Sequence, residues 1–75
     1  MDYEDLEDEL KARYRMYCDD RGVPYVDEDE EFFVKTAIAS IENIMTGGFD
    51  VKEAYELYLE EIEDDLDYVV REVEE

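Results

Sequence analysis

The chain has 75 residues, of which 26 are Asp or Glu and seven are Lys or Arg, so its formal net charge is −19 at pH 7. It has no His and a single Cys, which excludes an internal disulfide and removes the commonest catalytic base. Such a polyanion repels nucleic acids and anionic membranes, whose binding depends on Lys and Arg. We therefore expect neither direct nucleic-acid binding nor membrane binding.

A first helix is predicted over residues 3–20, where apolar residues recur every three or four positions. Asp2 is a candidate N-cap, and the acidic residues come early in this segment while the basic ones come late. That order complements the helix dipole at both ends. The sequence Arg21-Gly22-Val23-Pro24 predicts a turn after the helix, because Gly suits the left-handed conformation and Pro prevents continuation.

A second helix is predicted over residues 28–46, the most hydrophobic stretch of the chain. Asp27 and Glu30 have the spacing of a capping box, and the segment ends before Gly47-Gly48.

A third helix is predicted over residues 51–73, and Asp50 with Glu53 has capping-box spacing at its start. A straight helix of this length would measure about 35 Å, whereas the other two would be nearer 27 Å. Its apolar end would then extend beyond the other two helices and expose hydrophobic surface to solvent. A second copy of the chain would bury that surface, so the sequence also indicates a possible homodimer. The residues of this apolar end are Leu66, Val69, Val70 and Val73.

Together these segments predict an all-α fold, a small antiparallel three-helix bundle with a long acidic C-terminal helix. We expect residues 1–75 to form one helical domain. The predicted core is Leu6, Leu10, Tyr14, Phe33, Ala37, Ile38, Ile41, Ile44, Tyr55, Leu59, Ile62 and Leu66.

The residues offer little catalytic or metal-binding chemistry, so we expect no enzyme, no catalytic residue, no metal site and no cofactor. Ser40, the only Ser, is in the apolar second helix and is expected to pack there. Asp27, Asp29 and Glu31 resemble the start of a calcium loop but lack its sixth-position Gly. The remaining carboxylates are expected on solvated helix faces. Acid–base catalysis by a pair of carboxylates needs one of them to be desolvated so that its pKa is shifted, and solvated faces do not provide this.

The strongest functional signal is a row of carboxylates on the third predicted helix. Its members recur every three or four residues and should lie about 5 Å apart along one face, a spacing close to that of phosphates along a nucleic-acid strand. Like charges at this spacing destabilise a helix, so their retention indicates a use for the charge. With a second row beside it, and with two exposed Tyr as aromatic contacts, the predicted partner-binding residues are Glu53, Glu56, Glu60, Glu63, Asp67, Glu61, Asp65, Tyr68 and Tyr25.

In charge, size and Tyr content the whole chain resembles the small acidic proteins with which phages occupy nucleic-acid sites on host enzymes, such as anti-restriction and anti-CRISPR proteins. This resemblance implies a non-enzymatic DNA mimic that binds a basic nucleic-acid-handling protein, such as a nuclease or CRISPR effector. The alternative is a small helical assembly or dimerisation module, from a phage virion or a halophile, whose acidity serves solubility. The N-terminus lacks the features of a signal peptide, so the expected location is the cytoplasm, that of the host cell if the gene is a phage's.

Overall fold

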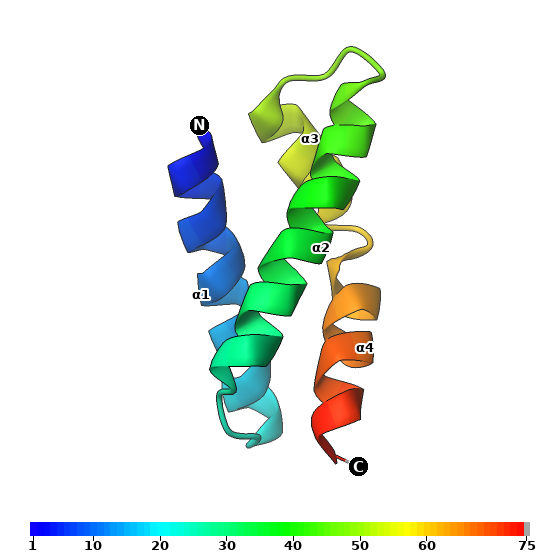
Figure 1. Ribbon diagram of the computed structural model, residues 1–75. Helices are drawn as coiled ribbons and strands as arrows, with labels where there is room; N and C mark the ends of the chain where they lie inside the picture. Colours follow the sequence, from blue (N-terminus) through cyan, green and yellow to red (C-terminus); the bar gives the residue numbers. More distant parts are fainter. Residues whose placement is uncertain (75) are drawn as a thin grey trace.

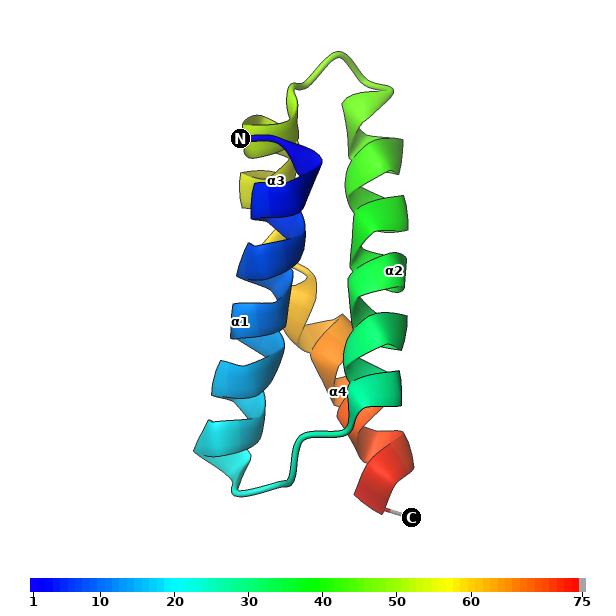
Figure 2. The same cartoon turned by 60° about the vertical axis from the view of Figure 1, so that its left-hand side comes forward.

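The computed structural model describes the backbone of residues 1–74 and the side chains of residues 1–70. This part of the chain is all-helical, with α1 at Tyr3–Arg21, α2 at Asp27–Met45, α3 at Val51–Tyr58 and α4 at Ile62–Glu74. Helices α1 and α2 run antiparallel, and α3 and α4 follow one another along the third side of the bundle (Figure 1 and Figure 2). The molecule is elongated, 38 Å long and 19 Å across in both other directions.

The prediction of three helices is wrong, because the segment expected to form one helix over residues 51–73 is broken at residues 59–61. The N–H of Glu60 donates to the carbonyl of Leu57 at 3.3 Å, and the N–H of Glu61 donates to that of Tyr58 at 2.8 Å. These bonds reach back three residues instead of four, so the backbone makes a tighter turn there. No Gly or Pro marks this break in the sequence.

The density of negative charge gives a physical reason for the break. In a continuous helix, Glu63 and Asp64 would sit in mid-helix beside Glu56, Glu60 and Glu61, at spacings where like charges repel. The turn instead places Glu63 and Asp64 in the first turn of α4. The N-terminal end of a helix carries partial positive charge, and each acidic side chain there gains about 0.3–1 kcal/mol.

The break also brings the end of the chain back onto the bundle. Leu66, Val69 and Val70 are only 4%, 2% and 4% exposed, so the prediction that they form an apolar overhang is wrong. The side chain of Val73 lies outside the described residues. The described part of the apolar surface that favoured a homodimer is therefore buried within one chain.

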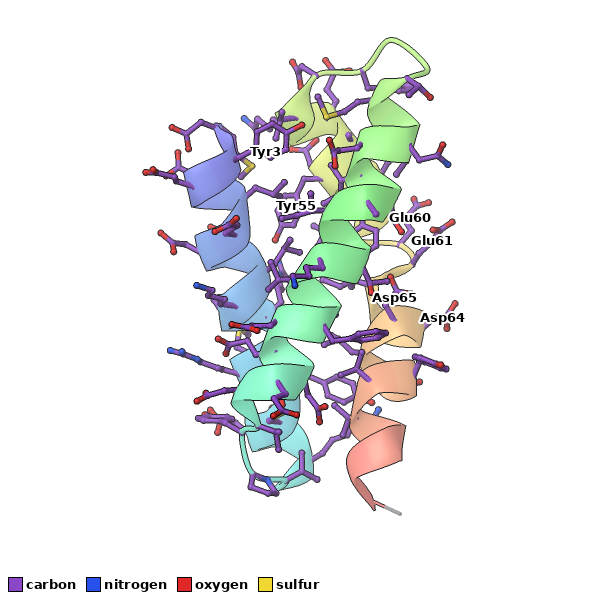
Figure 3. The ribbon with its side chains drawn as sticks, in the orientation of Figure 1. Tyr3, Tyr55, Glu60, Glu61, Asp64 and Asp65 are labelled. Carbon is purple, nitrogen blue, oxygen red and sulfur yellow. The ribbon has the colours of Figure 1, made fainter. Side chains whose placement is uncertain are left out.

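The core lies along the axis of the bundle, and α2 packs against each of the other three helices. Tyr55 points from α3 toward α1 (Figure 3), where its hydroxyl donates to Glu9 at 3.4 Å. Nine of the predicted core residues are buried, but Ile38, Ile44 and Leu59 are partly exposed. The structure adds six buried residues to the core, namely Cys18, Val34, Ala54, Tyr58, Val69 and Val70.

Several predicted helix ends are confirmed. The side chain of Asp2 accepts from the N–H of Asp5 at 2.9 Å, and that of Asp50 accepts from the N–H of Glu53 at 2.8 Å. Gly22 takes a left-handed conformation with φ of 68°, and its N–H donates to the carbonyl of Asp19. This is the arrangement in which Gly ends a helix without the steric cost of a Cβ.

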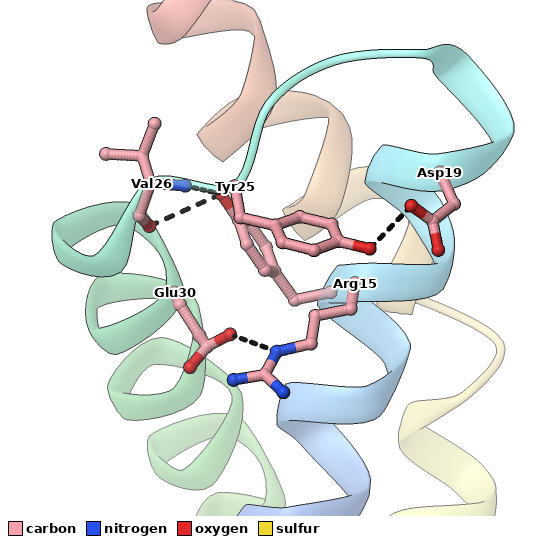
Figure 4. Close-up of polar contacts among 6 residues, drawn as sticks. Arg15, Asp19, Tyr25, Val26 and Glu30 are labelled. Carbon is pink, nitrogen blue, oxygen red and sulfur yellow. Dashed lines mark hydrogen bonds and ion pairs between the residues drawn. The ribbon is translucent and has the colours of Figure 1, made fainter.

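The start of α2 differs from the predicted capping box at Asp27. The helix is capped at Val26, whose side chain offers no hydrogen bond. The hydroxyl of Tyr14 supplies it instead, because it accepts from the Val26 N–H at 3.1 Å and donates to the Val26 carbonyl at 3.4 Å (Figure 4). The Tyr14 ring stacks against Phe33 with centroids 6.4 Å apart, which fixes the hydroxyl in place.

Replacing Tyr14 by Phe should destabilise the fold by about 1–3 kcal/mol, because the partly buried backbone N–H of Val26 loses its acceptor while the ring volume stays. Urea unfolding should show a lower midpoint with an unchanged slope. Tyr68→Phe is the matched control, since Tyr68 is 60% exposed, and it should change stability by less than about 0.5 kcal/mol. Equal midpoints for the two variants would contradict the capping role of Tyr14.

Candidate partner-binding surface

Five of the predicted partner-binding carboxylates are exposed, but they do not form one straight row. Glu53 and Glu56 lie on α3, Glu60 and Glu61 in the turn, and Glu63 at the start of α4. Because the helix breaks in the middle of the row, the carboxylates follow a bent path over two helices. Figure 3 shows Glu60 and Glu61 extending from the turn on the side away from α1.

Asp64 belongs to the same surface, although the periodicity of the sequence did not select it. Its side chain is exposed and extends outward close to those of Glu60 and Glu61 (Figure 3). The even row chosen from the sequence left this position out, although Asp64 follows Glu60 by four residues and Glu61 by three. We name the set the α3–α4 acidic surface, which consists of Glu53, Glu56, Glu60, Glu61, Glu63 and Asp64.

Asp65 and Asp67 were predicted to face a partner, but the structure gives them contacts within the chain. The hydroxyl of Tyr58 donates to Asp65 at 2.6 Å, and that of Tyr17 donates to Asp67. Arg21 also reaches Asp67, with 3.5 Å between the guanidinium nitrogen and the carboxylate oxygen. These two carboxylates therefore attach α4 to the rest of the bundle. The sequence continues the second row, Glu61 and Asp65, to Glu72, whose side chain lies outside the described residues.

The two predicted aromatic contacts are exposed, but Tyr25 is not near the acidic surface. Tyr25 is 50% exposed in the loop between α1 and α2, at the end of the bundle away from α3 (Figure 1). Its hydroxyl donates to Asp19 (Figure 4), and this hydrogen bond raises the pKa of the phenol. Tyr68 is 60% exposed on α4. Of the two predicted aromatic contacts, Tyr68 is therefore the one that lies on the same segment of the chain as the acidic surface.

Two basic side chains of α1, Arg15 and Arg21, pair with carboxylates on other helices. Arg15 contacts Glu30 at 3.1 Å (Figure 4), and Arg21 lies over the Tyr17 ring at 4.4 Å from its centroid. Tyr14 is 1% exposed, so it cannot stack on a nucleic-acid base. Among the described residues, no ion pair includes a member of the α3–α4 acidic surface. The charge of this surface is therefore available to a partner.

In the part of the chain that the structure describes, the acidic residues do not gather into a metal centre. Within the described residues, no three Asp, Glu or Cys side chains are close enough to hold an ion together. Across the same residues, no helix has both the length and the apolar character needed to cross a membrane.

Comparison with protein-family models, with curated proteins and with solved structures finds no match for this chain.

Stability should fall at alkaline pH because two buried phenols resist ionisation in the fold. Burial raises the pKa of Tyr14 to about 12, and burial together with the bond to Asp65 raises the pKa of Tyr58 far above its usual range. In the unfolded chain both ionise near pH 10. The folded state therefore holds more protons above that pH, so the stabilisation is complete below about pH 10 and is lost as pH rises.

The expected slope is at most about 1.4 kcal/mol per pH unit for each tyrosine. Urea unfolding between about pH 8 and about pH 11 measures it. Burial also raises the pKa of Cys18, so a Cys18→Ala background isolates the phenols. In that background, Tyr14→Phe with Tyr58→Phe should make the profile shallower, and Tyr25, whose pKa is also raised, contributes to the slope that remains. An unchanged slope would show that these phenols do not control alkaline stability.

Salt should stabilise the isolated protein, because it screens repulsion among exposed carboxylates that lack basic partners. The Debye length falls from about 30 Å at 0.01 M to about 8 Å at 0.15 M, so the melting temperature should rise over this range. Replacing Glu56, Glu60 and Glu61 by Gln should reduce that rise. A melting temperature independent of salt in the parent protein would mean that local pairing outweighs net repulsion.

Proposed function

We propose that this chain is a non-enzymatic inhibitor that binds a basic nucleic-acid-handling protein and occupies its nucleic-acid site by imitating phosphate charge. The observation that supports the proposal is the α3–α4 acidic surface. Its six carboxylates come from two helices and the turn between them, and in the described residues none has a basic partner.

Electrostatic interactions of such a surface favour the complex with a basic partner over the free protein. The carboxylates repel one another in the free protein, and a groove lined with Lys and Arg would replace that repulsion with attraction. The same groove gains its affinity for nucleic acid from phosphates, so the two ligands compete for one set of charges. The bent path of the carboxylates adds a shape requirement that a straight row would not impose.

The partner class is a nuclease or a CRISPR effector, and the inhibitor class is the phage-type anti-CRISPR or anti-restriction protein acting in the host cytoplasm. The alternative is a small helical assembly or dimerisation module whose acidity serves solubility, and an exposed apolar end of the C-terminal segment would have favoured its dimerisation. Because Leu66, Val69 and Val70 are buried, that observation no longer supports it.

The structure identifies which acidic residues to reverse in a test. Glu63 lies in the first turn of α4, where Lys would oppose the helix dipole. Glu56 and Glu60 are exposed away from that end, and Glu61 lies between the C-terminal end of α3 and the N-terminal end of α4, where the effects of a Lys on the two helix dipoles oppose one another. Joint replacement of Glu56, Glu60 and Glu61 by Lys also removes like-charge repulsion, so it should leave the melting temperature unchanged or raised. The same variant should lose at least about a hundredfold in affinity, because each reversal creates a like-charge contact in a basic groove.

The measurement is a competition assay on the partner recovered from host lysate, with DNA or RNA as competitor. The matched control reverses Asp8, Asp20 and Glu42, exposed acids on α1 and α2, and changes the net charge equally. We expect the control to bind nearly as well as the parent, and nucleic acid to displace both. If saturating nucleic acid leaves the complex intact and the Glu56, Glu60 and Glu61 variant binds unchanged, the acidity serves solubility alone.

A further inference from the structure

A shallow groove along α3 combines acidic and apolar side chains. It has a volume of about 250 Å³ and is lined by Phe49, Glu53, Glu56 and Leu57. Phe49 and Leu57 are 42% and 41% exposed, so two large apolar side chains face solvent here. The buried face of α3 consists of Ala54, Tyr55 and Tyr58. The core therefore does not explain Leu57.

The start of α3 places apolar and acidic side chains next to one another along the groove. Phe49 directly precedes Asp50, whose carboxylate caps α3. Glu53 and Leu57 lie four residues apart, so they occupy one face of the helix with Glu56 beside them. Two of the six members of the α3–α4 acidic surface thus border the apolar groove. Lys52, on the same helix, is not among its lining residues.

The charge around the groove determines what can enter it. A second copy of this chain would bring another formal charge of −19 against Glu53 and Glu56, and nucleic acids and anionic membranes are repelled for the same reason. The groove is smaller than the roughly 300–1,000 Å³ of small-molecule sites, which makes it suitable for one protein side chain. A basic protein segment satisfies both the charge and the size.

We propose that this groove receives an apolar side chain of a basic partner protein, with Lys or Arg on either side of that residue contacting Glu53 and Glu56. The inference rests on the proposed function and adds the recognition element that phosphate imitation lacks. An acidic surface alone binds any polycation, since charge complementarity has little shape specificity. An apolar anchor with a charged rim is the arrangement in which few residues supply most of the affinity.

Two synthetic peptides test the groove directly, whichever protein is the natural partner. Both carry the same Lys residues at helical spacing, and one has Leu where the other has Gln. Fluorescence anisotropy of the labelled peptides should show that the Leu peptide binds about five- to tenfold more tightly. Leu57→Gln should remove this difference while leaving the weaker, salt-dependent binding of the Gln peptide unchanged. Phe32→Gln is the control, since Phe32 is 49% exposed on α2, away from the groove.

Each outcome bears on the proposal separately from the proposed function. Loss of the Leu preference in Leu57→Gln but not in Phe32→Gln supports the groove, provided that circular dichroism melts show both variants folded. Equal binding of the two peptides overturns the groove and leaves the acidic surface as a binder of cations. An equal effect of the two substitutions also overturns it. If neither peptide binds, the groove proposal fails, and the competition assay with nucleic acid still decides the proposed function.

Discussion

The hydrogen bond from a tyrosine hydroxyl to a carboxylate is the interaction on which this fold depends. A chain with 26 acidic and seven basic residues cannot pair most of its carboxylates with Lys or Arg. In the described residues four tyrosines take that role, and three of them join different helices. A phenol donates while adding no charge, and its ring supplies apolar area that a Lys would not. The pairs are Tyr17–Asp67, Tyr25–Asp19, Tyr55–Glu9 and Tyr58–Asp65.

This chemistry divides the carboxylates into two groups with different roles. Those within reach of a tyrosine, such as Asp65 and Asp67, hold α4 against the bundle through hydrogen bonds within the chain. Those beyond that reach, such as Glu60 and Asp64, remain on the surface with their repulsion unrelieved (Figure 3). The abundance of tyrosine is explained within the molecule, so it is a weaker sign of an interface than its frequency in the sequence implied. The functional proposal depends on the second group alone.

Local patterns predicted much of this structure, and the errors share one cause. The first two helices, the caps at Asp2 and Asp50 and the turn at Gly22 each depend on neighbouring residues, and each was predicted. The break at residues 59–61 carries no Gly or Pro and arises from charge density and from packing against α2. The roles of Asp65 and Asp67 depend on Tyr58 and on Tyr17, which is far away in the chain. The periodicity of the sequence identifies the helix face on which a residue lies. It does not identify which side chain from another helix contacts that residue.

The cap that Tyr14 provides for α2 also bears on how the chain folds. A helix that begins with its own Ser or Asp cap can form before it meets the rest of the protein, but α2 receives its cap from α1. The N–H of Val26 therefore gains its hydrogen-bond acceptor only when the two helices dock and Tyr14 meets Phe33. Helices in proteins owe most of their stability to the packing of their apolar face, so docking and helix initiation reinforce one another. Secondary and tertiary structure are thus gained in the same step, which favours a cooperative transition for so small a protein.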